Sequence, residues 1–196
     1  SESDLVQHCD VVVDDDRELD ELLTTIDRCP QAALATVLLL RGVETRTIEE
    51  SLIAESTTYS LLQSGAEFAQ WKNHRVEKSF ASSDEDEVLS ERIDDHLMIT
   101  LNRPTRRNAY SSTMRAALAE VLNVAVVDRT ISAVTLRGAG SNFSSGGDLD
   151  EFGSSADPVT AHISRLTSSV GASLNTLRDD YSAQKFGVTF SAMNSK

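Results

Sequence analysis

The hydrophobic pattern divides the chain into two regions, and the first of them is helical. Apolar side chains recur at helical spacing between residues 17 and 75, where the acidic run at residues 14–16 favours a helix N-terminus. Pro30 begins a second helix, which Gly42 ends. A third, longer helix is predicted over about residues 47–74, and its candidate buried positions include Ile48, Ile53 and Trp71.

The second region alternates between strands and helices. Residues 88–92 and 96–101 are β-rich runs joined by a predicted hairpin turn. Ser111 or Ser112 caps a helix that runs to about residue 128. A second buried strand is expected at residues 131–136, and a further helix runs from Pro158 toward Leu177. This order predicts an α/β architecture with helices packed on a sheet.

Between the two regions lies a short charged segment that has little apolar surface to bury. The predicted organisation is therefore a helical N-terminal extension, a polar linker, an α/β core and a tail of uncertain structure, at residues 1–80, 81–87, 88–178 and 179–196.

Composition excludes several classes of function. The net charge of −13 argues against a protein that grips nucleic acid through a broad positive surface. Residues 32–40 form the longest apolar stretch and reach only half of the roughly 20 residues that span a bilayer, so no membrane segment is expected. Cys9 and Cys29 form no CxxC pair, which favours a reducing, cytoplasmic location without a disulfide or metal framework.

Two polar loops follow the predicted strands and could form a ligand site from main-chain N–H groups. In the second loop, Gly146 and Gly147 let the backbone approach a ligand closely, just before a short predicted helix at residues 148–151. N–H groups at such a junction can stabilise an oxyanion. On spacing alone, an ordinary turn is the more common explanation of this segment.

Other motifs are weaker. Residues 138–140 read GAG, but Phe143 stands where a dinucleotide fingerprint needs its third glycine. Neither a P-loop nor a nucleophile elbow occurs. The acidic residues Asp148, Asp150 and Glu151 fit the charge pattern of a first helical turn better than a metal site or a proton-transfer site. His162 has no second metal ligand one turn away.

The two loops together match a family. LNRPTRRNAYS and VTLRGAGSNFSSGGDLDEF resemble the crotonase superfamily, the enoyl-CoA hydratase/isomerase family, over about residues 88–165. The resemblance implies a partial crotonase-like ββα core that binds an acyl-CoA thioester, with coenzyme A as part of the substrate and no separate cofactor. It assigns to Gly147 the first backbone donor of an oxyanion hole, in which a thioester enolate is stabilised.

The resemblance also implies which residues contact coenzyme A. The main chain of Ser145, Gly147 and Leu149 lines the adenine and pantetheine track. Arg107 and Ala109 lie in the loop that meets the nucleotide, and either Arg106 or Arg107 reaches its phosphates, although a solvated loop explains these arginines as well.

In the family, a second oxyanion donor and the acid/base carboxylates come from later segments that this chain lacks. The fold is therefore expected to be truncated before its second half, with poor solubility or partial disorder after about Arg178, and the hydratase or isomerase activity is left open. Two alternatives remain: a non-catalytic module for CoA binding or oligomer interaction, and a truncated gene product. Relatives commonly form trimers or hexamers, which implies a homo-oligomer for the complete protein.

Overall fold

The computed structural model describes residues 6, 9–76, 85–154, 157–181 and 188–192, with the side chains described up to residue 178. The chain divides into two compact units, Ser1–Arg75 and Val76–Lys196. Most of the predicted linker, residues 81–84, lies outside the described residues. Within the described part, no helix combines the length and the apolar character that crossing a bilayer requires.

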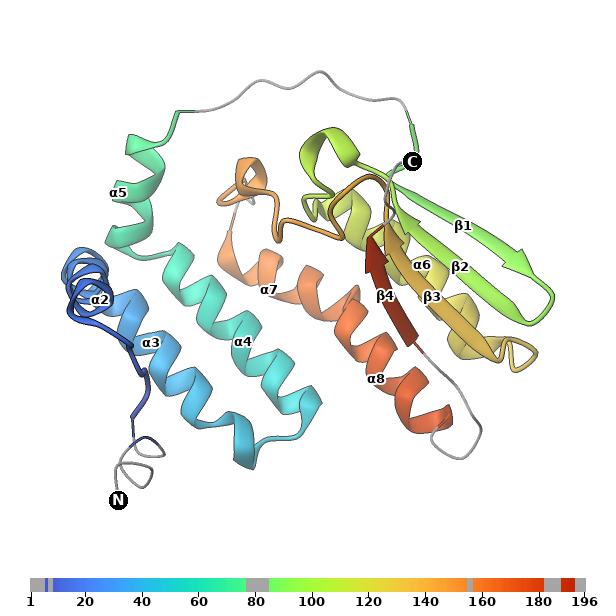
Figure 1. Cartoon of the computed structure of the whole chain (residues 1–196), viewed down its shortest axis with the longest axis horizontal. Helices are drawn as coiled ribbons and strands as arrows, with labels where there is room; N and C mark the ends of the chain where they lie inside the picture. The colour runs from blue at the N-terminus through green and yellow to red at the C-terminus, as the bar shows by residue number, and fades with distance from the viewer. Residues whose placement is uncertain (1–5, 7–8, 77–84, 155–156, 182–187, 193–196) are drawn as a thin grey trace. The chain divides into compact units, whose positions relative to one another are not determined.

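The first unit is helical, as predicted (Figure 1). The Asp15 side chain caps α2, and Pro30 begins α3 before Gly42 ends it. One prediction is wrong, because the long helix expected over residues 47–74 is two helices. Between them Gly65 has an extended backbone with φ −84° and ψ 163°, and the low helix propensity of glycine favours a break at this position. The helices are α2 Asp16–Arg28, α3 Pro30–Arg41, η1 Val43–Thr45, α4 Ile48–Gln63 and α5 Ala66–His74.

The helices of this unit pack mainly on their neighbours in the chain. Ser56 and Ser60 are its buried residues among those described, and Ile48, Ile53 and Trp71 are 39%, 50% and 39% exposed. The prediction that these apolar positions are buried is therefore wrong. A helix that packs mainly on its neighbours in the chain covers part of its apolar surface and leaves the rest open.

The second unit is a sheet with helices against it (Figure 1). The sheet order is β1-β2-β3-β4, with β1 and β2 antiparallel and the other two pairs parallel. The predicted hairpin is confirmed, and Asp94 takes the left-handed conformation of a tight turn at φ 55°. The elements are β1 Val88–Ile93, β2 His96–Leu101, η2 Pro104–Arg106, α6 Ser112–Val127, β3 Ala133–Gly138, η3 Leu149–Glu151, α7 Pro158–Thr167, α8 Val170–Tyr181 and β4 Val188–Ala192.

Three boundaries differ from the prediction. The strand expected at residues 131–136 begins at Ala133, because the Asp128 carboxylate and carbonyl accept hydrogen bonds from the N–H groups of Thr130 and Ile131 and hold these residues in a turn. The helix expected from Pro158 to Leu177 is broken at Ser168 into α7 and α8. Within the predicted tail, α8 continues to Tyr181 and β4 pairs with β3.

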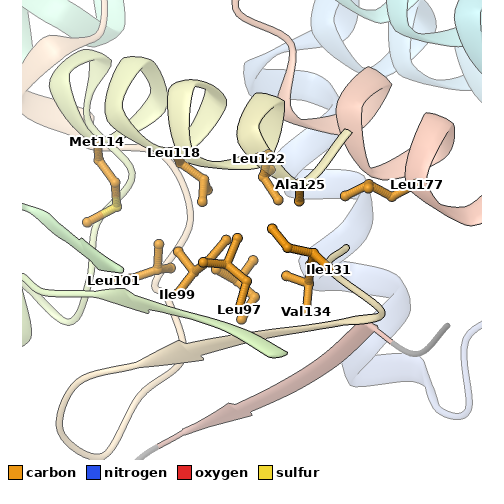
Figure 2. Packing of buried hydrophobic residues seen from close by; sticks show 11 residues of the cluster. Leu97, Ile99, Leu101, Met114, Leu118, Leu122, Ala125, Ile131, Val134 and Leu177 are labelled. Atoms are coloured by element: carbon orange, nitrogen blue, oxygen red, sulfur yellow. The ribbon is translucent and has the colours of Figure 1, made fainter. Parts of the chain in front are cut away.

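The core of the second unit lies between the sheet and the helices α6 and α8. Figure 2 shows α6 side chains facing those of β2 and β3, with Leu177 of α8 beside them. Ile99, Met114, Leu122, Val134 and Leu177 are fully buried. Close packing of this kind fixes the positions of β2 and β3, and hence of the loops that leave their carboxyl ends.

Candidate functional site

Two loops meet at one edge of the sheet. We call residues 102–111, which follow β2, the arginine loop, and residues 139–152, which follow β3, the glycine loop. Because β2 and β3 are parallel and Leu101 pairs with Gly138, both strands end at the same edge. The arginine loop and the glycine loop therefore leave the sheet side by side.

Asn108 joins the two loops from a buried position. Its side chain is 0% exposed, and its backbone takes the left-handed conformation at φ 53°. The Oδ1 atom accepts a hydrogen bond from the Arg103 N–H at 2.8 Å. The Nδ2 group donates to the carbonyl oxygens of Ala139 at 2.9 Å and Asn142 at 2.8 Å. One carboxamide therefore connects the ends of two strands that are far apart in sequence.

A short parallel bridge between Tyr110 and Gly147 fixes the backbone of the glycine loop. The Tyr110 N–H donates to the Gly146 carbonyl at 2.8 Å, and the Asp148 N–H donates to the Tyr110 carbonyl at 3.0 Å. Successive peptide groups of an extended chain point in opposite directions, so the Gly147 N–H lies on the side away from Tyr110. Gly147 is exposed, and its N–H has no acceptor within the described residues.

Gly146 and Ser144 shape the approach to this bridge. Gly146 has φ +87°, a conformation that glycine adopts without strain. The Ser144 hydroxyl donates to the Asn108 carbonyl at 2.8 Å and accepts from the Gly146 N–H at 3.2 Å. Of the glycine pair, Gly146 takes a positive φ and Gly147 does not.

The Asp148 carboxylate is the electrostatic centre of the site. It is 4% exposed and accepts hydrogen bonds from Arg106 Nη2 at 2.7 Å and Arg103 Nη1 at 3.1 Å. It also caps η3 by accepting from the Asp150 N–H at 3.1 Å. Arg106 Nη2 contacts Asp150 Oδ2 as well, at 2.5 Å. A buried carboxylate is tolerated when it is paired and hydrogen-bonded in this way.

The N-terminus of α6 is fixed by the same loops. Ser111 is the cap; it accepts from the Met114 N–H at 2.9 Å, and its hydroxyl donates to the Glu87 carboxylate. Glu87 also pairs with Arg103, with Nε and Oε1 3.0 Å apart. The Glu151 carboxylate accepts from the Ser112 N–H at 2.6 Å. The acidic residues of the glycine loop thus pair with arginines and main-chain donors, in agreement with their interpretation as structural charges.

Sequence reasoning missed three residues that organise this site: Glu87, Arg103 and Asn108. Glu87 lies in the predicted linker, and Arg103 and Asn108 lie in the motif LNRPTRRNAYS, in which the resemblance implies no role for their side chains. For Arg103 and Asn108, the available signal was their place in the polar loop that follows the buried strand β2. Glu87 precedes the mostly exposed strand β1 and carried no such signal.

The residues predicted to bind ligand gather along this edge but differ in exposure. Gly147, Ser145 and Arg107 are exposed, and Leu149 is 49% exposed. Arg107 is in the left-handed conformation at φ 52°, and its side chain has no ion-pair partner within the described residues.

Arg106 and Ala109 are much less accessible than the other four. The Arg106 side chain is 18% exposed and ion-paired, and Ala109 is buried with its carbonyl accepting from Arg103 Nη1 at 2.7 Å. Next to Ala109, burial of the Tyr110 ring raises the pKa of its phenol to about 12. The hydroxyl of Tyr110 is therefore neutral at physiological pH.

Comparison with known proteins gives a consistent family. The family model described as "Enoyl-CoA hydratase/isomerase" matches residues 94–180. The chain is 38% identical over 76 residues to "Probable enoyl-CoA hydratase EchA14" of Mycobacterium tuberculosis, a match that covers 38% of this chain and 30% of that protein. It is 44% identical over 55 residues to "1,2-epoxyphenylacetyl-CoA isomerase" of Escherichia coli, covering 28% and 21%.

A solved structure of an enoyl-CoA hydratase from Mycobacterium tuberculosis H37Rv is 37% identical in sequence, with a TM-score of 0.35. The match covers 36% of this chain and 28% of that one. The chain therefore matches less than a third of the length of each of these relatives.

Proposed function

We propose that this chain, which belongs to the crotonase superfamily through residues 94–180, binds an acyl-CoA thioester at the edge formed by its two loops. The Gly147 N–H donates a hydrogen bond to the thioester carbonyl oxygen. Coenzyme A enters as part of the substrate, and this role needs no separate cofactor.

The direction of the Gly147 N–H is the observation that carries the proposal. The neighbouring Gly146 carbonyl and Asp148 N–H are both held by Tyr110, which leaves the Gly147 N–H outward and already oriented. A preorganised donor of this kind stabilises a developing oxyanion by about 3–4 kcal/mol.

The outer part of the loops supports a role in holding coenzyme A. Arg107 is exposed and carries its charge next to the loop, which suits contact with a nucleotide phosphate. Leu149 offers apolar surface to the pantetheine chain, and the exposed Ser145 contributes main chain, whereas the main chain of the buried Ala109 is bonded within the arginine loop. Of the two adjacent arginines, Arg107 is the one we assign to the phosphates, because Arg106 is engaged with Asp148 and Asp150.

Hydration or isomerisation of the thioester requires a second oxyanion donor and an acid/base carboxylate in addition to the Gly147 N–H. A single N–H polarises the carbonyl, whereas turnover also requires proton transfer at the neighbouring carbons. In the described residues, Asp148, Asp150 and Glu151 are held in structural bonds. The substrate-binding half of the reaction is therefore the part that we place on this chain.

A second function is favoured by the surface of the helical unit. Leu34, Leu38 and Leu61 are 61%, 56% and 67% exposed, and exposed leucines of this kind occur where proteins associate. We therefore propose that the unit Ser1–Arg75 contributes to a homo-oligomer. Light scattering that shows a single monomeric mass at micromolar concentration would exclude this role. We also propose a cytoplasmic location, which the two cysteines without a CxxC spacing favour.

Binding measurements on two Gly147 variants test the thioester site. Gly147→Ala keeps the N–H, and the nearest atom to its Cβ, at 2.9 Å, is a side-chain atom, Cε1 of the Phe152 ring, rather than backbone. Gly147→Pro removes the N–H. In calorimetric titration, the wild type and Gly147→Ala should bind acyl-CoA more tightly than CoA, and Gly147→Pro should lose this preference.

The spectroscopy of the wild type provides a readout that does not depend on variant folding. The carbonyl stretch of a ¹³C-labelled thioester should move to lower frequency on binding, and the Gly147 amide proton should shift with acyl-CoA but not with CoA. Equal affinity for CoA and acyl-CoA, together with an unmoved carbonyl stretch, would refute the proposed function.

A further inference from the structure

We infer that the adjacent arginines Arg106 and Arg107 act differently, with Arg106 a positioning residue for the Gly147 N–H and Arg107 the cation that meets the ligand. This inference rests on the proposed function and deepens it. The two residues have the same chemistry and adjacent positions, so their different roles follow from the structure around each side chain.

Arg106 is directed into the protein. Its side chain is 18% exposed, and its Nη2 atom lies 2.7 Å from Asp148 Oδ1 and 2.5 Å from Asp150 Oδ2. Asp148 is itself 4% exposed and depends on paired donors for its charge to be stable there. If Arg106 left Asp148 to bind a phosphate, the buried carboxylate would lose its shorter ion pair, at 2.7 Å, and keep the longer one with Arg103, at 3.1 Å. This loss opposes a movement of Arg106 to the ligand. The structure therefore assigns Arg106 to the glycine loop.

Asp148 transmits this effect to the proposed donor. It follows Gly147 directly, and its N–H is bonded to the Tyr110 carbonyl at 3.0 Å. Because Arg106 anchors the Asp148 carboxylate, the peptide group between Gly147 and Asp148 is held in place. The preceding peptide group, which carries the Gly147 N–H, is fixed with it. Arg106 also neutralises the Asp148 carboxylate, which is adjacent in sequence to the donor Gly147. Without this pairing, the negative charge of Asp148 would oppose the charge that develops on the thioester oxygen.

Arg107 has the opposite environment. It follows η2 in the left-handed conformation, with φ 52°, and its N–H is bonded to the Pro104 carbonyl at 3.0 Å. Its residue is exposed, and within the described part of the chain its guanidinium has no carboxylate partner. An exposed guanidinium keeps its donors available for a phosphate, at little cost in desolvation.

The matched variants Arg106→Gln and Arg107→Gln separate the two roles. Arg107→Gln should lower the affinities for CoA and for acyl-CoA by the same factor, and this loss of affinity should become smaller as the salt concentration rises. The shift of the carbonyl stretch in the bound thioester should remain. Arg106→Gln should leave the affinity for CoA within about 2-fold of wild type and lower the preference for acyl-CoA about 10-fold, because the donor is misplaced. Arg106→Lys, which restores the charge, should recover part of the preference and part of the carbonyl shift.

Amide exchange tests the positioning role without any ligand. In Arg106→Gln, the Asp148 amide should exchange with solvent about 10-fold faster than in wild type, whereas Arg107→Gln should leave its rate unchanged. A wild type that shows no preference for acyl-CoA refutes the proposed function, and the exchange rates then still decide the role of Arg106. Unchanged Asp148 exchange in Arg106→Gln, or an Arg106→Gln variant that weakens CoA as much as Arg107→Gln, would overturn the inference.

Discussion

Replacement of Asn108 should destabilise the second unit more than any change on its surface. The carboxamide is fully buried and makes hydrogen bonds with the Arg103 N–H and with the carbonyl oxygens of Ala139 and Asn142, at 2.8, 2.9 and 2.8 Å. Each bond contributes about 1 kcal/mol to the free energy of unfolding, so their loss costs about 3 kcal/mol.

The backbone of Asn108 adds a second contribution that glycine and alanine separate. At φ 53°, alanine is strained by about 1 kcal/mol relative to a residue that tolerates the left-handed region, whereas glycine is not. We therefore expect a loss of about 4 kcal/mol for Asn108→Ala and about 3 kcal/mol for Asn108→Gly. The two variants share the loss of the carboxamide and differ in backbone strain.

Urea unfolding read by hydrogen exchange and mass spectrometry is the suitable assay, because peptides from β2 and β3 report on the second unit alone. The midpoint should fall in the order wild type, Asn108→Gly, Asn108→Ala, with an unchanged dependence on urea. A loss below about 1 kcal/mol for Asn108→Ala would show that the carboxamide does not hold the two loops together. A glycine variant less stable than the alanine variant would contradict the role of the backbone conformation.

Three further changes test the buried core, the close contact between Gly138 and the glycine loop, and the dependence of stability on pH. Ile99→Ala empties a fully buried position and should cost about 2–5 kcal/mol in the same assay, whereas a loss below about 1 kcal/mol would contradict its burial. Gly138→Ala would place a Cβ 2.4 Å from the carbonyl oxygens of Asn142 and Phe143, so we expect a similar loss and a changed amide spectrum in the glycine loop; an unchanged spectrum would refute this.

Hydrogen bonds from Thr130 and Arg92 hold the pKa of the Asp128 carboxyl below its ordinary value of 3.8. The resulting stabilisation is complete above that value and is lost as pH falls through the lower pKa of the folded state. The gap in stability between wild type and Asp128→Asn should therefore narrow between about pH 5 and pH 2 in unfolding titrations, and a constant gap would refute the assignment.

The local pattern of the chain predicted those features that neighbouring residues decide. Pro30 and Gly42 bound α3, and Ser111 caps α6, because helix ends depend on backbone groups within one turn. The hairpin of β1 and β2 was predicted for a similar reason, since its turn lies between two β-rich runs. The break at Gly65 also had a local signal, because a glycine lies within the helical pattern. The prediction of one long helix did not take this glycine into account.

The sequence by itself determined most of the elements, their order and the presence of two polar loops with a glycine pair, but not the helix breaks at Gly65 and Ser168 or the strand β4. Only the tertiary structure decided that Arg106 pairs with Asp148, 42 residues away, and that Asn108 is buried between the loops. It also decided that apolar residues of the helical unit stay exposed. The physical reason is separation along the sequence. Helix caps and turns form between residues a few positions apart, whereas the burial of Asn108 and the pairing of Arg106 depend on the parallel register that brings the ends of β2 and β3 to one edge.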